Sequence, residues 1–320
     1  MQNFELNTTI SNLRSLRESD LTSYDAVYLG NIYCRVFEDN LLEKMDDLRD
    51  AIAGVKDLGL RAYVSTYAVP RNDSLAKVEQ ALETAAEAGA DAVEVHNLGV
   101  LRAVHERFPQ MPVHVGGFAN VYTDAGATVL RDYGAVRFTP NYEISLEEAK
   151  GIASSSGLPA EILVHGKMPL GVSDYCFLLE YEEKWPDKCP VLCQKSLFLK
   201  QGEWAMRSVG KGVLSGKDVC MLEHLPLLAA AGCSIFRIEN AYESPAYRSE
   251  VARLYRAALE CVGARETLVE GSAWEVVRRH TEIGLCNGFY FGLSGADYIG
   301  QQHIGQQHAG QQEQLLVVLS

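Results

Sequence analysis

The stretch Asp25-Ala26-Val27-Tyr28-Leu29-Gly30 is a short apolar run that ends in glycine, and a helical pattern follows it. In that pattern, apolar residues recur every three or four positions, at Leu42, Met45, Leu48, Ile52 and Val55. This spacing lines one face of a helix. A buried strand followed by such a helix is the repeating unit of α/β proteins, in which the helix carries the chain to the next parallel strand. The stretch therefore predicts a parallel sheet.

The same strand–helix unit recurs along most of the chain. Further strands are predicted at 4–8, 61–69, 91–96, 112–116, 135–139, 159–165 and 234–239. Helical patterns follow at 10–19, 78–89, 100–108, 125–133, 145–155, 219–231 and 245–261. Eight such units predict closure into a (β/α)8 barrel of the TIM type. The alternative is an open doubly wound sheet, but the sequence contains no dinucleotide-binding glycine pattern that favours it.

The predicted barrel domain covers residues 1–263, and two shorter segments follow it. A long polar insertion at 167–217 interrupts the barrel after its seventh strand and carries three cysteines. We expect residues 264–299 to form a C-terminal extension that packs on the barrel. Residues 300–320 form a Gln-rich tail with a five-residue repeat, a composition that is typical of disordered segments.

Composition limits the kinds of partner. With 29 basic and 42 acidic residues among 320, the net charge is −13, which argues against a general binder of polyanions. Nucleic acid is therefore not the expected partner. The sequence begins without a basic and apolar targeting signal, and it contains no apolar run of the roughly 20 residues that span a membrane. We expect a cytoplasmic protein with no membrane span.

Several cysteines are predicted to gather on one face of the barrel. Active sites of such barrels form where the strands end, in the loops that follow them. Cys34 follows the second strand, and Cys176, Cys189 and Cys193 lie in the insertion after the seventh. Cys220, which opens the predicted helix at 219–231, lies near the same rim and is the alternative to Cys34. Two others are predicted away from this rim: Cys233 and Cys261.

Four thiolates on one face suit a tetrahedral zinc ion or an iron–sulfur cluster. There are 12 residues between Cys176 and Cys189 and 3 between Cys189 and Cys193, which is not the spacing of paired zinc-ribbon knuckles. The alternative interpretation is that these are ordinary free thiols, which are among the most buried residue types.

Four other side chains are candidates for chemistry at the barrel mouth. Glu161 and His165 lie four residues apart on the seventh strand, so alternation places them on the same side. His165 is a candidate for substrate binding or acid–base chemistry, and the alternative is a hydrogen-bonded histidine of the barrel. Arg237 and Glu239 share a face of the eighth strand. An arginine there suits a carboxylate ligand, and the alternative is an internal Arg–Glu pair that fills the barrel.

Three segments of the chain resemble the signature of peptidase family U32, the collagenase-like peptidases. They are Glu161–Cys176 (EILVHGKMPLGVSDYC), Leu214–Cys220 (LSGKDVC) and Ala231–Asn240 (AGCSIFRIEN), and the resemblance covers most of residues 20–262. Where the family usually has its first cysteine after the His-Gly motif, this chain has Pro169. In that respect it is similar to the UbiV-type branch of iron–sulfur proteins, which serve oxygen-independent ubiquinone biosynthesis.

The resemblance implies a 4Fe–4S cluster held by Cys34, Cys176, Cys189 and Cys193. It also implies oxygen-independent hydroxylation of a small molecule, a ubiquinone precursor, with prephenate as oxygen donor and a related family member as partner in a heterodimer. One alternative is an RNA-base hydroxylase of the same family. Others are a non-catalytic iron–sulfur scaffold or a peptidase, although the sequence has no His-Glu-x-x-His zinc helix.

Overall fold

The structure is a computed structural model that describes residues 3–37, 39–181, 189–202, 204–264 and 271–300. Its centre is a run of eight parallel strands in the order β6-β5-β4-β3-β2-β1-β11-β7. These strands are β1 (Glu5–Ile10), β2 (Ala26–Leu29), β3 (Arg61–Ser65), β4 (Ala92–Val95), β5 (Val113–Val115), β6 (Ala135–Phe138), β7 (Glu161–Val172) and β11 (Ile235–Glu239). All eight predicted strands are therefore present, and each pairs with a neighbour in the same sense.

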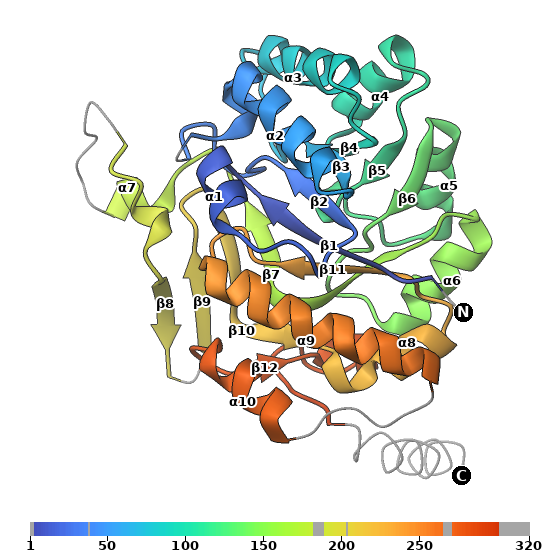
Figure 1. Cartoon of the computed structure of the whole chain (residues 1–320), viewed down its shortest axis with the longest axis vertical. Helices are drawn as coiled ribbons and strands as arrows, with labels where there is room; N and C mark the ends of the chain where they lie inside the picture. Colours follow the sequence, from blue (N-terminus) through green and yellow to red (C-terminus); the bar gives the residue numbers. More distant parts are fainter. Residues whose placement is uncertain (1–2, 38, 182–188, 203, 265–270, 301–320) are drawn as a thin grey trace, which may run out of the picture.

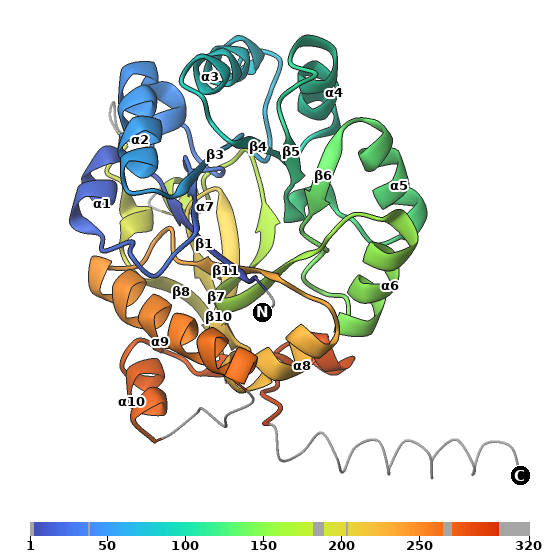
Figure 2. The ribbon, with the colours of Figure 1, turned by 45° about the vertical axis from the view of Figure 1, so that its right-hand side comes forward.

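Helices cover the outside of this sheet, as Figures 1 and 2 show. They are α1 (Leu13–Glu18), α2 (Met45–Asp57), α3 (Leu75–Glu87), α4 (Leu98–Arg107), α5 (Asp124–Asp132), α6 (Leu146–Ser156), α8 (Leu225–Ala230) and α9 (Pro245–Ala264). On α2, the buried positions include four of the five apolar residues whose spacing predicted the helix, and the fifth, Leu42, is buried in the turn before it. Helix α6 begins with a capping box, in which Ser145 and Glu148 each satisfy the other's backbone N–H.

The sheet does not close by a continuous ladder. Between β6 and the start of β7 there is one isolated bridge, from Phe138 to Ala160, with the Phe138 N–H donating to Pro159 at 3.2 Å. The two strands barely overlap, because this bridge lies at the last residue of β6, Phe138, and just before the first residue of β7, Glu161. The prediction of an α/β fold with a parallel sheet is thus confirmed, whereas a closed (β/α)8 barrel is not.

The insertion contains strands that the sequence did not reveal. β7 continues to Val172 and pairs antiparallel with β10 (Gly212–Cys220), which is followed outward by β9 (Trp204–Ser208) and β8 (Leu197–Gln201). The predicted helix at 219–231 is therefore wrong in its first part, since Cys220 ends a strand and α8 begins only at Leu225. Lys167, the first residue of the predicted polar insertion, lies within β7 and forms a buried ion pair of 3.0 Å with Asp218 on β10.

The residues after α9 also pack on this part of the sheet. α10 (Gly271–Arg279) is followed by β12 (Leu285–Cys286), which adds to β10 in parallel. Asn287 then exchanges two hydrogen bonds with Ile299, of 2.7 and 3.1 Å. The predicted disordered tail lies outside the described residues after position 300. Among the described helices, none is both long and apolar enough to cross a membrane.

Gly166 is the point where β7 passes closest to β11, and it provides a test of this topology. Its φ is +105°, and a Cβ placed there would lie 2.0 Å from the carbonyl oxygen of Glu239. We predict that Gly166→Ala lowers the free energy of unfolding by at least about 2 kcal/mol, from backbone strain and the clash. Chemical denaturation measures this change. The matched control is Gly171→Ala on the same strand, where a Cβ meets no atom within 4 Å; equal effects in both variants would contradict the topology.

Candidate functional site

A layer of ionised side chains fills the interior of the sheet. Arg237 on β11 donates from Nη2 to Oε1 of Glu94 at 2.6 Å, and its Nε lies 2.8 Å from Oε1 of Glu161. Arg137 on β6 lies 2.7 Å from Glu5 on β1 and 3.2 Å from Glu161 on β7. All five residues are at most 8% exposed. Each charge is therefore compensated by neighbours from other strands, which is the condition for burying charges at all.

Aromatic and polar groups complete this layer. The Tyr28 hydroxyl donates to Oε2 of Glu161 at 2.7 Å, and the Arg237 guanidinium lies 4.0 Å from the centre of the Tyr28 ring. Burial alone would raise the pKa of Glu94, but the charges of Arg237 and His96 hold it well below its usual range. Glu94 is thus an ionised counterion. Arg237 makes the internal ion pair that was the alternative to a ligand-binding role, with Glu94 and Glu161 as its partners.

Glu161 and His165 do not share a side, and that prediction is wrong. In the pairing of β7 with β11, Arg237 lies opposite Leu163 and Ile238 lies opposite His165, so Val164 is an extra residue. A β-bulge of this kind reverses the alternation beyond it. The His165 ring contacts helix α9, where Nδ1 lies 3.1 Å from the Tyr255 hydroxyl. Burial lowers the pKa of His165 to about 3, so the ring is neutral at physiological pH.

Glu239 lies at the carboxyl end of β11, above the charged layer. Burial raises the pKa of Glu239. The charge of Arg237 and the N–H of Ala241, 3.2 Å away, lower it, but the effect of burial is larger and the pKa is raised. The Glu239 charge also raises the pKa values of Tyr33 and Tyr142, after burial as the main cause. A half-buried carboxyl group with a raised pKa can exchange a proton, so Glu239 is the acid–base candidate at this end of the sheet.

The four predicted cysteine ligands come together. Burial, together with the charges of the other three thiols, Cys34, Cys189 and Cys176, raises the pKa of Cys193 to about 12. The thiols of Cys176 and Cys189 likewise raise the pKa of Cys34. Two loops distant in sequence therefore bring their thiols within electrostatic range of one another. A Cβ on Gly210 would lie 3.2 Å from Sγ of Cys176, so glycine is needed for this approach.

Cys220 lies apart from these thiols. It is fully buried, and the Tyr255 hydroxyl of α9 donates to its Sγ at 3.8 Å. None of the main electrostatic influences on its pKa comes from Cys34 or the three cysteines of the insertion. Of the two candidates for the fourth position, the structure places Cys34 and not Cys220 with the insertion.

An aromatic cluster connects the cysteines to the mouth of the sheet. Cys34 and Cys193 pack with Tyr33, Phe37 and Tyr242. The Tyr242 ring lies 5.1 Å from Phe37 and 6.1 Å from Tyr33, centre to centre. The sequence reasoning missed these aromatic residues, although Tyr33 directly precedes Cys34 and was the one available signal.

The donor set of this site determines which metal group it suits. Within the described residues, no three His, Cys, Asp or Glu side chains form a site for a single metal ion. A 4Fe–4S cluster spaces four thiolates more widely than one ion does, because each thiolate binds a different iron. Four thiols drawn from two loops, in largely buried and aromatic surroundings, fit the donor set of such a cluster.

Comparison with known proteins decides the family. The model of peptidase family U32 matches residues 11–299. The chain belongs to peptidase family U32.

The curated proteins that are similar to this U32 protein carry different names. It is 23% identical, over 77% of its length, to a 23S rRNA 5-hydroxycytidine C2501 synthase of Escherichia coli, of which it spans 38%. It is 28% identical, over 81% of its length, to an uncharacterized protease of Methanocaldococcus jannaschii, of which it spans 65%. It is 25% identical, over 92% of its length, to the tRNA hydroxylation protein P of Escherichia coli, of which it spans 78%. The chain thus spans less than two thirds of the first two relatives.

The charged layer gives a direct prediction for Arg237. Replacing it by glutamine leaves Glu94 and Glu161 buried without their counterion, so Arg237→Gln should lower the free energy of unfolding by about 3–5 kcal/mol. Chemical denaturation measures the change. The control is Arg253→Gln on α9, where an exposed arginine donates to the Ser249 carbonyl, and a change within about 0.5 kcal/mol is expected. If the two variants were equally stable, the layer would not support the fold.

Proposed function

We propose that this U32 protein takes part in oxygen-independent hydroxylation, using a 4Fe–4S cluster held by Cys34, Cys176, Cys189 and Cys193. The observation that carries the proposal is the gathering of these four thiols from two distant loops beside the mouth of the sheet. The names of two relatives, a hydroxycytidine synthase and a tRNA hydroxylation protein, support hydroxylation as the reaction class.

Each part of the site then has a separate task. When bound, the cluster would supply redox or Lewis-acid chemistry next to a ligand. Glu239 would hold or release a proton at its carboxyl group, whose pKa is raised by burial. Tyr33 and Tyr242 would exclude water between Glu239 and the thiols. Glu161, Arg237 and His165, which the sequence offered as catalytic residues, would position the strands and α9 and would not touch the ligand.

Two substrate classes remain, and each has an observation in its favour. A base of RNA is supported by the two relatives that are named for RNA hydroxylation. A ubiquinone precursor is supported by the net charge of −13, which disfavours a polyanion, and by Pro169, the feature shared with the UbiV-type branch. For either substrate, the proposal includes prephenate as the oxygen donor and a partner chain of the same family in the cytoplasm.

The ligand set is tested by iron content. Protein purified without oxygen should hold about four iron atoms per chain, and Cys34→Ser, Cys176→Ser, Cys189→Ser and Cys193→Ser should each lose most of them. Cys261→Ser, on α9, is the matched control and should retain the iron, as should Cys220→Ser. Iron and acid-labile sulfide assays provide the measurement. Full iron in Cys34→Ser together with loss in Cys220→Ser would show that the fourth ligand is misassigned.

The substrate is tested in cells that lack the gene for this chain and grow without oxygen. We predict that these cells lose a hydroxylated product. A reintroduced wild-type gene should restore the product, and a gene that encodes Cys34→Ser should not. Mass spectrometry of nucleosides from total RNA and of extracted quinones measures both products in one culture. Loss of a hydroxylated nucleoside alone assigns the RNA base, and loss of ubiquinone alone assigns the quinone precursor. If both were unchanged, the proposed hydroxylation would be wrong.

A further inference from the structure

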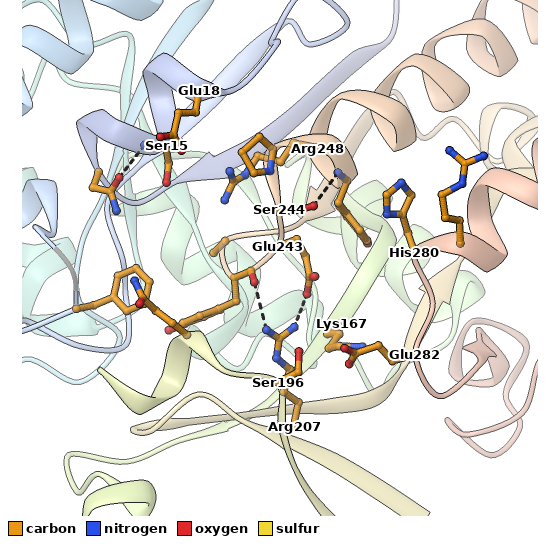
Figure 3. Close-up of a pocket in the computed structure, with 18 residues that line it drawn as sticks. Ser15, Glu18, Lys167, Ser196, Arg207, Glu243, Ser244, Arg248, His280 and Glu282 are labelled. Carbon is orange, nitrogen blue, oxygen red and sulfur yellow. Dashed lines mark hydrogen bonds and ion pairs between the residues drawn. The ribbon is translucent and has the colours of Figure 1, made fainter. Parts of the chain in front are cut away.

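A cavity of about 510 Å³ lies beside the first turn of α9, and Phe37 and Tyr242 are among the residues that line it. Its walls come from α1, from β9 and from the loop between β11 and α9 (Figure 3). This volume lies in the range of small-ligand pockets. The hydroxylation proposal gives this cavity no role.

Arg248 is the unusual residue of this cavity, because it is only 3% exposed and has no carboxylate partner in the described part of the chain. Its Nη1 donates to the Ser19 hydroxyl and its Nη2 to the Asn240 carbonyl, both at 3.3 Å. Its buried Nε has no acceptor. Burial lowers the pKa of Arg248, although the nearby charges of Glu243, Glu239 and Glu18 act in the opposite direction without forming an ion pair with it. A buried guanidinium in this condition is costly unless an anion joins it.

Arg207 on β9 borders the same cavity, and Figure 3 shows it on the side opposite Arg248. It is 2% exposed, forms an ion pair with Glu243 and donates to the Tyr242 carbonyl at 3.2 Å. Its Nε is also buried without an acceptor. Two buried guanidinium groups on the lining of one cavity therefore each keep an Nε donor without an acceptor.

Most of the other charged groups that line the cavity are paired, and Glu282 is a further carboxylate on its lining. Lys167 is bound to Asp218 at 3.0 Å, and His280 lies 3.0 Å from Glu250. Among the acidic residues, Glu18 pairs with Arg14 at 2.9 Å. Helix α9, which is 20 residues long, points its amino end at the cavity, and that end carries a partial positive charge.

We propose that this cavity binds a phosphate group, held between Arg248 and Arg207 at the amino end of α9. A phosphate offers several acceptor oxygens in different directions, which suits two guanidinium groups on opposite walls better than a single acceptor does. The phosphate could belong to a small phosphomonoester or to an RNA backbone. The proposal goes beyond hydroxylation, since it requires neither the cluster nor the reaction, and binding alone tests it.

The first experiment titrates inorganic phosphate into the full chain by isothermal calorimetry, at constant ionic strength. Wild-type protein should bind, and Arg248→Gln should weaken binding roughly tenfold or more, because a charge-assisted hydrogen bond is lost. The affinity of Arg248→Lys for phosphate should lie between those of the wild-type protein and Arg248→Gln. The matched control is Arg253→Gln, which removes the same charge from the exposed side of α9 and should bind like wild type. Equal affinity in wild type and Arg248→Gln would overturn the proposal.

A second measurement keeps the test valid if Arg248→Gln does not fold. Phosphate should raise the melting temperature of the wild-type protein above that in chloride of equal ionic strength, because a ligand stabilises the state that binds it. No difference between the two salts would overturn the proposal. Competition experiments then identify the source of the phosphate. If a mononucleotide and a short RNA displace inorganic phosphate equally well, the site binds a small phosphomonoester. If only the RNA displaces it, the site binds a backbone phosphate.

Discussion

The ion pairs of Arg237 with Glu94 and Glu161 are the constraint on which the rest of the structure depends. Removing one partner would leave a buried charge uncompensated, so the strands that carry them are held in one arrangement. The same layer of side chains also connects two strands that share almost no backbone hydrogen bonds. β6 and β7 share only one isolated bridge, yet Arg137 on β6 reaches Glu161 on β7 at 3.2 Å. Side chains thus join the two strands at the point where the ladder of hydrogen bonds stops.

The charged layer also determines where chemistry can occur. Because ion pairs and the Tyr28 ring fill the interior, we expect the ligand of the proposed reaction above this layer, at the carboxyl ends of the strands. Glu239 lies there, and the aromatic cluster connects it to Cys34 and Cys193. The arrangement therefore concentrates the acid–base candidate and the thiols at one end of the sheet.

Sequence periodicity was sufficient for the eight parallel strands and most of the covering helices, and it placed Cys34 near the cysteines of the insertion, with Cys220 as the alternative. Periodicity did not predict side-chain directions and ion pairs that depend on how neighbouring strands pair. The bulge at Val164 turns His165 toward α9, and no pattern within β7 itself reveals an extra residue relative to β11. Lys167 was assigned to a polar insertion because its partner, Asp218, lies 51 positions away in the sequence. The 143 positions between Arg237 and Glu94 hid their pairing in the same way.

The central claim is that the four gathered thiols hold an iron–sulfur cluster. The most direct measurement is the electron paramagnetic resonance spectrum of protein purified without oxygen and then reduced by one electron, with metal analysis of the same sample. The account predicts the signal of a reduced 4Fe–4S cluster and about four iron atoms per chain. One zinc ion per chain, with no iron and no signal, would contradict it.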